Sequence, residues 1–167
     1  MIENIAIKIL TEDFITMEAR SLEEFTVTGF TARTCNADEL EPTTAKIAPL
    51  WQHFYQHAVP SLGEQSCVYG VYSNYESDAE GQYDISVGAT ELSADRLEGA
   101  KHVHIPAGQY LVFTAKGEMP KTVIGLWGEI WSYFGNSDCP HERAYTYDYE
   151  RYLDEQSVEI CIAINGF

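Results

Sequence analysis

The chain has 167 residues, of which 45% are hydrophobic and 22% are charged, a composition typical of a folded globular domain. Ten basic residues against 26 acidic ones give a formal net charge of −16, so direct binding to nucleic acid is not expected. No apolar run approaches the roughly 20 residues that span a bilayer. Because the N-terminus lacks a signal-peptide pattern and the four cysteines are scattered, we expect a cytoplasmic protein with reduced thiols.

Helix-like and strand-like segments follow one another in the same order twice. Apolar residues recur with a period of 3.6 in two helices, and runs rich in β-branched and aromatic residues predict the strands. Thr43 or Thr44 is positioned to cap the first helix. The expected elements are strands at 15–19, 25–34, 67–75, 83–90, 109–115, 143–152 and 158–164, and helices at 47–58 and 123–134.

The repeated order suggests an internal duplication. Leu50-Trp51 and Leu126-Trp127 occupy the same place in their helices, 76 residues apart (126 − 50), and at that offset Asn74 falls on Glu150. Coincidence in an aromatic-rich chain is the alternative. We expect one α+β domain over 1–167, with antiparallel sheets built from duplicated strand-helix-strand-strand units. The half-units, about 15–92 and 100–165, would be related by a pseudo-twofold axis with a ligand cleft at their seam.

Motifs for nucleotide phosphates and for a serine nucleophile elbow are missing from the sequence. The pairs His53/His57 and His102/His104 could each lend two ligands to a metal, but no third ligand stands at a recognisable spacing. Exposed or core histidines are the simpler interpretation. We therefore expect neither a cofactor nor a metal site.

Aromatic residues alternate with acids over 145–152. In a strand, Tyr145 and Tyr149 would lie on one face, and Asp148, Glu150 and Tyr152 on the other. A carboxylate enclosed by aromatic rings is suited to an organic cation, because the ring faces are electronegative and the carboxylate supplies the opposite charge. The alternative is that Glu150 is one more solvated acid among 26.

The helix aromatics Trp51, Trp127 and Trp131 stand at core spacing, and packing is their default role. Tyr55 extends the first stripe sideways with a polar tip, which suits a pocket wall. Gly125 and Gly128 flank Trp127, and glycines inside a helix suggest that another element approaches the backbone there.

Three segments together resemble the GyrI-like small-molecule-binding domain, the effector-binding half of AraC-type and MerR-type multidrug-responsive regulators. They are Ile105-Pro106-Ala107-Gly108-Gln109-Tyr110 leading into a strand, the Trp-bearing helix after it, and Tyr149-Glu150-Arg151-Tyr152 before the last strand. The resemblance implies the duplicated architecture with its pocket at the seam. The regulators carry a helix-turn-helix domain before this module, and only about 20 residues precede the first clear strand here. The chain thus looks like a stand-alone effector module, similar to members encoded by integron cassettes.

The resemblance also implies a site. Glu150 corresponds to the cation-binding glutamate of the family, and Tyr152 to a wall residue. Further wall candidates are Trp127, Trp131, Tyr72, Trp51 and Tyr55. The expected ligand is a cationic, lipophilic or aromatic small molecule.

Two other functions stay open at this stage. The resemblance also implies that a hydrolase of this family, acting on an electrophilic small molecule, would use the equivalent glutamate, which would need a raised pKa. The acidic surface could instead bind a basic protein partner by mimicking DNA, with salt-sensitive affinity. A protein partner or a homo-oligomer is compatible with the sequence, whereas a membrane partner is not expected.

Overall fold

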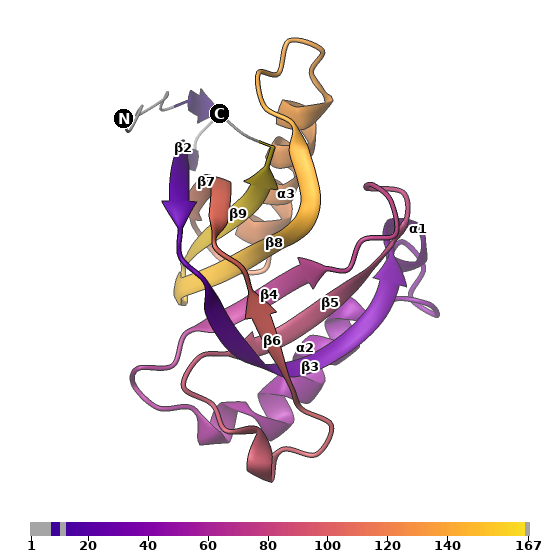
Figure 1. The fold of residues 1–167 in the computed structure, drawn as a ribbon, viewed down its shortest axis with the longest axis vertical. Helices are drawn as coiled ribbons and strands as arrows, with labels where there is room; N and C mark the ends of the chain where they lie inside the picture. The colour runs from indigo at the N-terminus through magenta and orange to yellow at the C-terminus, as the bar shows by residue number, and fades with distance from the viewer. Residues whose placement is uncertain (1–7, 11–12, 166–167) are drawn as a thin grey trace.

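The computed structural model describes residues 8–10 and 13–165, which form one curled antiparallel sheet with helices against it (Figure 1). The α+β class expected from the sequence is confirmed. The strands are β1 (Lys8–Leu10), β2 (Asp13–Leu22), β3 (Phe25–Cys35), β4 (Val68–Ser73), β5 (Gln82–Ala89), β6 (Lys101–Ile105), β7 (Gly108–Lys116), β8 (Arg143–Asp154) and β9 (Ser157–Ile164). The α-helices are α1 (Asn36–Glu39), α2 (Ile47–His57) and α3 (Lys121–Gly135), and 3-10 turns lie at Val59–Ser61 and Ala94–Arg96.

The sheet order reveals the duplication. Its strands run β1-β2-β7-β9-β8-β4-β5-β3-β6, so the series β7-β9-β8 is mirrored by β4-β5-β3 about the central β8–β4 pair. The strand that precedes each half in the chain pairs with the other half: β2, which precedes β3, pairs with β7, and β6, which precedes β7, pairs with β3 (Figure 1). The seam between the halves is therefore the antiparallel pairing of β4 with β8.

Each half packs its own helix on the same face of the sheet. Phe54 of α2 is fully buried against β5, and Ile130 of α3 is fully buried against β7 and β9. A third apolar cluster on the opposite face includes Tyr69 and Tyr149. Since the two helices cover different halves, the seam strands lie beneath the space between α2 and α3.

Several local expectations need correction. The cap of α2 is neither Thr43 nor Thr44, because the carboxylate of Glu39 accepts hydrogen bonds from the backbone N–H groups of Lys46 and Ile47. Nothing approaches Gly125 or Gly128 within 4 Å of an added Cβ atom, so neither glycine is needed for close packing. The short helix α1 was not expected from the sequence. No described helix is long and apolar enough to cross a membrane.

Candidate ligand-binding site

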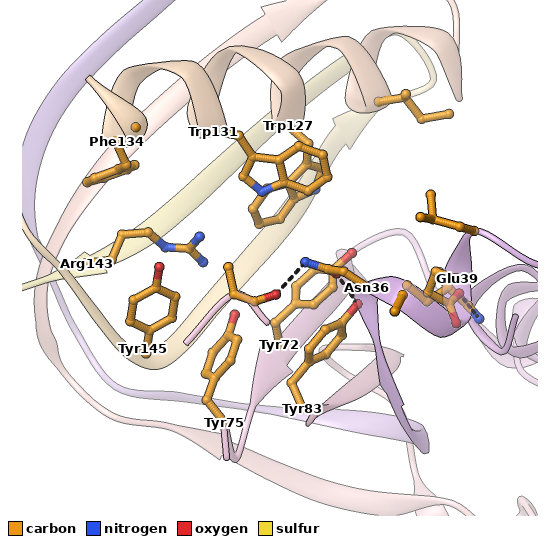
Figure 2. A pocket seen from close by; sticks show the side chains of 16 residues that line it. Asn36, Glu39, Tyr72, Tyr75, Tyr83, Trp127, Trp131, Phe134, Arg143 and Tyr145 are labelled. Atoms are coloured by element: carbon orange, nitrogen blue, oxygen red, sulfur yellow. Dashed lines mark hydrogen bonds between the residues drawn. The ribbon is translucent and has the colours of Figure 1, made fainter. Parts of the chain in front are cut away.

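A cavity of about 710 Å³ opens beside the seam, between α3 on one side and α1 with the start of α2 on the other (Figure 2). A volume of this size suits a ligand with several rings. Its lining is mainly aromatic and aliphatic, with Glu39 and Arg143 as the charged members. The lining residues are Asn36, Ala37, Glu39, Leu40, Ile47, Tyr72, Tyr75, Ala79, Tyr83, Ile124, Trp127, Trp131, Phe134, Gly135, Arg143 and Tyr145.

Glu150 lies at the seam behind two of these rings and is only 4% exposed. One carboxylate oxygen, Oε2, accepts hydrogen bonds from Trp127 Nε1 at 2.7 Å and from the Tyr72 hydroxyl at 2.9 Å. The other oxygen, Oε1, accepts one from the Tyr152 hydroxyl at 2.7 Å. No salt bridge joins Glu150 to a basic side chain in the part of the chain that the structure describes. Its negative charge is thus held by neutral donors alone.

The arrangement around Glu150 is nearly symmetric about the seam. Gly70 of β4 is its direct cross-strand partner, and Tyr72 and Tyr152 each lie two residues further along their strands. A Cβ atom on Gly70 would lie 2.9 Å from Glu150 Oε1, so the lack of a side chain there makes room for the carboxylate.

Burial dominates the ionisation of this cluster. Loss of water raises the pKa of Glu150 above its ordinary value, although the bonds from Trp127, Tyr152 and Tyr72 act to lower it. Burial and the neighbouring carboxylate raise the pKa values of Tyr72 and Tyr152 well above the usual range, so both hydroxyls keep their protons. Ionised Glu150 therefore carries a desolvation cost that a nearby cation would offset.

The site residues expected from the sequence fall into two groups. Tyr72, Trp127 and Trp131 line the cavity, with Trp131 half exposed at its mouth. Trp51 and Tyr152 do not line it; their rings pack edge to face at 5.4 Å on the far side of Glu150. The remaining candidate, Tyr55, is 60% exposed beside Trp51 and also lies outside the cavity.

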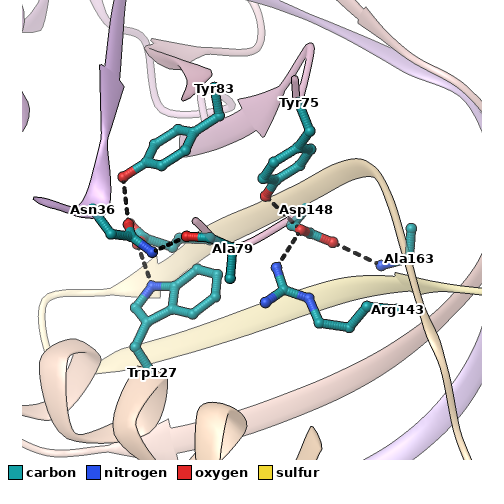
Figure 3. A network of polar contacts seen from close by, with 9 residues as sticks. Asn36, Tyr75, Ala79, Tyr83, Trp127, Arg143, Asp148 and Ala163 are labelled. Atoms are coloured by element: carbon teal, nitrogen blue, oxygen red, sulfur yellow. Dashed lines mark hydrogen bonds and ion pairs between the residues drawn. The ribbon is translucent and has the colours of Figure 1, made fainter. Parts of the chain in front are cut away.

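A second buried carboxylate supports one end of the cavity (Figure 3). Asp148 is fully buried and accepts hydrogen bonds from the Tyr75 hydroxyl at 2.6 Å, from Arg143 Nη2 at 2.8 Å and from the backbone N–H of Ala163 at 3.0 Å. The guanidinium of Arg143 stacks over the Tyr145 ring at 4.5 Å. Regular alternation would put Tyr145 on the face of Tyr149, but an irregularity in β8 brings it into the cavity instead.

Sequence reasoning missed the wall opposite α3. Asn36 of α1 accepts a hydrogen bond from the Tyr83 hydroxyl at 2.8 Å and donates one to the backbone oxygen of Ala79 at 2.9 Å. A four-residue helix has no periodic signal, so nothing in the local sequence marks Asn36.

The two histidine pairs considered as metal ligands, His53/His57 and His102/His104, have no third ligand beside them among the described residues. The ring centroids of His53 and His57 lie 4.3 Å apart with the ring planes tilted by 43°, and Nδ1 of His102 lies 2.9 Å from the Thr28 hydroxyl. Over the described ranges, no three His, Cys, Asp or Glu side chains gather as a metal site would require.

Comparison with known proteins decides the family. The model of the Cass2 family, the integron-associated effector binding proteins, matches residues 19–164. The chain belongs to this family. Its resemblance to effector-binding domains, stated from three short segments, is confirmed, and family membership supports a role in binding a small-molecule effector.

Two proteins share substantial sequence with this Cass2-family chain. The integron cassette protein VCH_CASS2 of Vibrio cholerae is 47% identical, with a TM-score of 0.86 over 89% of this chain and 95% of that one. YobU of Bacillus subtilis (strain 168), named as a candidate transcriptional regulator, is 33% identical over 78% of this chain and 82% of its own length.

A more distant structure shares the fold of the Cass2-family chain. It is SAV2435 bound to tetraphenylphosphonium, with 21% identity and a TM-score of 0.66 over 90% of this chain and 94% of that one.

Proposed function

We propose that this protein binds a cationic, aromatic small molecule in the cavity between α1 and α3, with Glu150 as the electrostatic anchor. The observation that carries the proposal is the buried carboxylate of Glu150, which three neutral donors hold and which no described basic side chain neutralises. An uncompensated buried charge is costly, and a bound cation is the partner that would offset the cost.

The geometry suggests how the charge acts on the cavity. Tyr72 and Trp127 line the cavity with their rings while their polar hydrogens bond to Glu150 behind them. Donation to a carboxylate shifts electron density into each ring, which strengthens the attraction of the ring face for a cation. The ligand would therefore lie against these rings and would not need to touch the carboxylate.

The rest of the chain favours the same ligand class. A net charge of −16 attracts cations and raises their rate of encounter with the cavity. The family is described as effector binding, and the related fold of SAV2435 holds the lipophilic cation tetraphenylphosphonium. The named relatives are cassette and regulatory proteins, so we infer binding without catalysis.

Two ions of nearly identical shape and opposite charge test the proposal. Tetraphenylphosphonium should raise the melting temperature of the protein and give a dissociation constant in the micromolar range, because a ligand selective for the folded state stabilises it by mass action. Tetraphenylborate should do neither. Equal binding of both ions would show that the cavity selects for apolar shape alone and would overturn the proposal.

A further inference from the structure

The charged lining of the cavity includes a donor that the cation-binding proposal does not use. Of its two charged members, Glu39 is engaged in capping α2. The other, Arg143, has a side chain only 7% exposed and one hydrogen bond, from Nη2 to Asp148. Its Nε atom is buried and has no hydrogen-bond partner among the described residues. Buried donors are almost always paired in native proteins, so an unpaired one at a cavity wall indicates a missing acceptor.

The backbone of β8 is distorted where Arg143 leaves it. Arg143 pairs with Ile164 and Asp148 with Ile162, so five steps along β8 match two along β9. Within this irregularity Tyr145 has a φ of 53°, which is uncommon for a residue with a large side chain. Bulges of this kind redirect side chains and concentrate next to functional sites.

Two aromatic rings lie near the guanidinium of Arg143. The centroid of the Tyr145 ring lies 4.5 Å from Cζ of Arg143, and the centroid of the Phe134 ring lies 6.0 Å from the same atom. Figure 2 shows Arg143 and Tyr145 together at one end of the cavity, while Tyr72, Asn36 and Glu39 occupy the other. Stacked faces leave the edge of a guanidinium, which carries its N–H donors, free for an acceptor.

Asp148 keeps this end from repelling a cationic ligand. Its carboxylate, 2.8 Å from Arg143 Nη2, balances the guanidinium charge within a largely buried pair. Burial acts to lower the pKa of Arg143, but Asp148, Tyr75 and Tyr145 together outweigh it and the pKa is raised, so the guanidinium stays charged. The pair thus presents directional donors with little net charge.

We propose that Arg143 forms an acceptor subsite, and that the preferred ligand is an aromatic cation that also carries a carboxylate. The cationic ring system would lie against Trp127 and Tyr72, as the proposed function requires, and the carboxylate would accept from the free edge of Arg143. This proposal specifies the ligand of the proposed function further, and it depends on that function only for the placement of the cationic ring system.

Two dyes that differ by one methyl group test the subsite. Rhodamine 123 is a cationic methyl ester, and rhodamine 110 is the corresponding acid, which has no net charge at pH 7.5. Fluorescence anisotropy should show rhodamine 110 binding about tenfold more tightly, as one charge-assisted hydrogen bond contributes. Attraction by Glu150 and the acidic surface alone would favour rhodamine 123, so weaker or equal binding of rhodamine 110 overturns the proposal.

Variants separate the subsite from the cation site. Arg143→Lys keeps the charge beside Asp148 but removes Nε, so it should weaken rhodamine 110 about tenfold and change rhodamine 123 less than twofold. Arg33→Lys is the matched control, because Arg33 pairs with Asp84 and does not line the cavity. Equal losses for both dyes in Arg143→Lys would argue against the subsite. If Arg143→Lys folds poorly, the comparison of the two dyes on the unaltered protein still tests the subsite.

The two proposals can fail separately. If Glu150→Gln leaves both dyes unchanged while rhodamine 110 remains preferred, the cation site is wrong and the acceptor subsite stands. If Glu150→Gln weakens both dyes and rhodamine 123 is preferred, the cation site stands and the subsite is wrong. Failure of both dyes to bind would contradict both.

Discussion

Replacing Glu150 with glutamine tests the electrostatic account most directly. The amide keeps the shape of the side chain: its oxygen can accept from Trp127 Nε1 and the Tyr72 hydroxyl, while its N–H can donate to the Tyr152 hydroxyl. The change removes one negative charge and leaves the cavity walls intact. Any loss of cation affinity then reports the charge.

The expected size of the loss follows from the distances. Trp127 Nε1 lies 2.7 Å from the carboxylate, and a cation lies within about 6 Å of the ring that it contacts. At a charge separation of about 7 Å and an effective dielectric constant of about 20, Coulomb's law gives about 2.4 kcal/mol, or roughly 50-fold in the dissociation constant.

Isothermal titration with tetraphenylphosphonium at pH 7.5 measures this loss. The matched control is Glu155→Gln, which removes the same formal charge at an exposed position in the turn between β8 and β9. We expect the control to bind as the unaltered protein does. If Glu150→Gln binds within twofold of the unaltered protein, the charge of Glu150 does not hold the ligand, and the reasoning from its burial fails.

Three further predictions concern the same elements. Because burial raises the pKa of Glu150, cation affinity should fall as the pH drops through that raised pKa. The free protein should lose stability as the pH rises from about 4.5 through the same pKa. Titrations and melting curves of Glu150→Gln should lack both changes. Gly70→Ala should lower the free energy of unfolding by about 1–3 kcal/mol and weaken cation binding, since the new methyl group would crowd Glu150 and Trp51. Urea unfolding and titration measure the two effects, and an unchanged variant would contradict the close approach. Gly125→Ala and Gly128→Ala should each stabilise the protein by about 0.5–1 kcal/mol in urea unfolding, with unchanged cation affinity, because both positions are exposed helix interior with open space; a loss of stability would refute this.

The helices and most strands could be predicted from the sequence because their signals are local. Residues three and four apart share a helix face, and alternate residues share a strand face, so Phe54 and Ile130 fall in the core as their spacing predicts. The repeated order of elements, with the family resemblance, also led to the duplicated fold class. The alternation of aromatic and acidic residues over 145–152 made Glu150 a candidate, but only the family resemblance favoured a binding role over that of a solvated acid.

What surrounds Glu150 was decided by tertiary structure. Its three donors come from β4, α3 and its own strand, and the Tyr72 donor is 78 residues away in the chain. Strand register placed Gly70, which the sequence did not single out, directly opposite it.

The sequence by itself determined most of the elements, their order and the chemistry available at the seam. Only the tertiary structure decided that Arg143 and Tyr145 face the cavity, because a distortion of β8 overrides the alternation that a regular strand imposes. It likewise left Tyr55 in solvent and brought in Asn36 from a helix too short to show periodicity. The physical reason is range: local periodicity fixes which face a residue takes, whereas register, bulges and helix placement depend on partners distant in the chain.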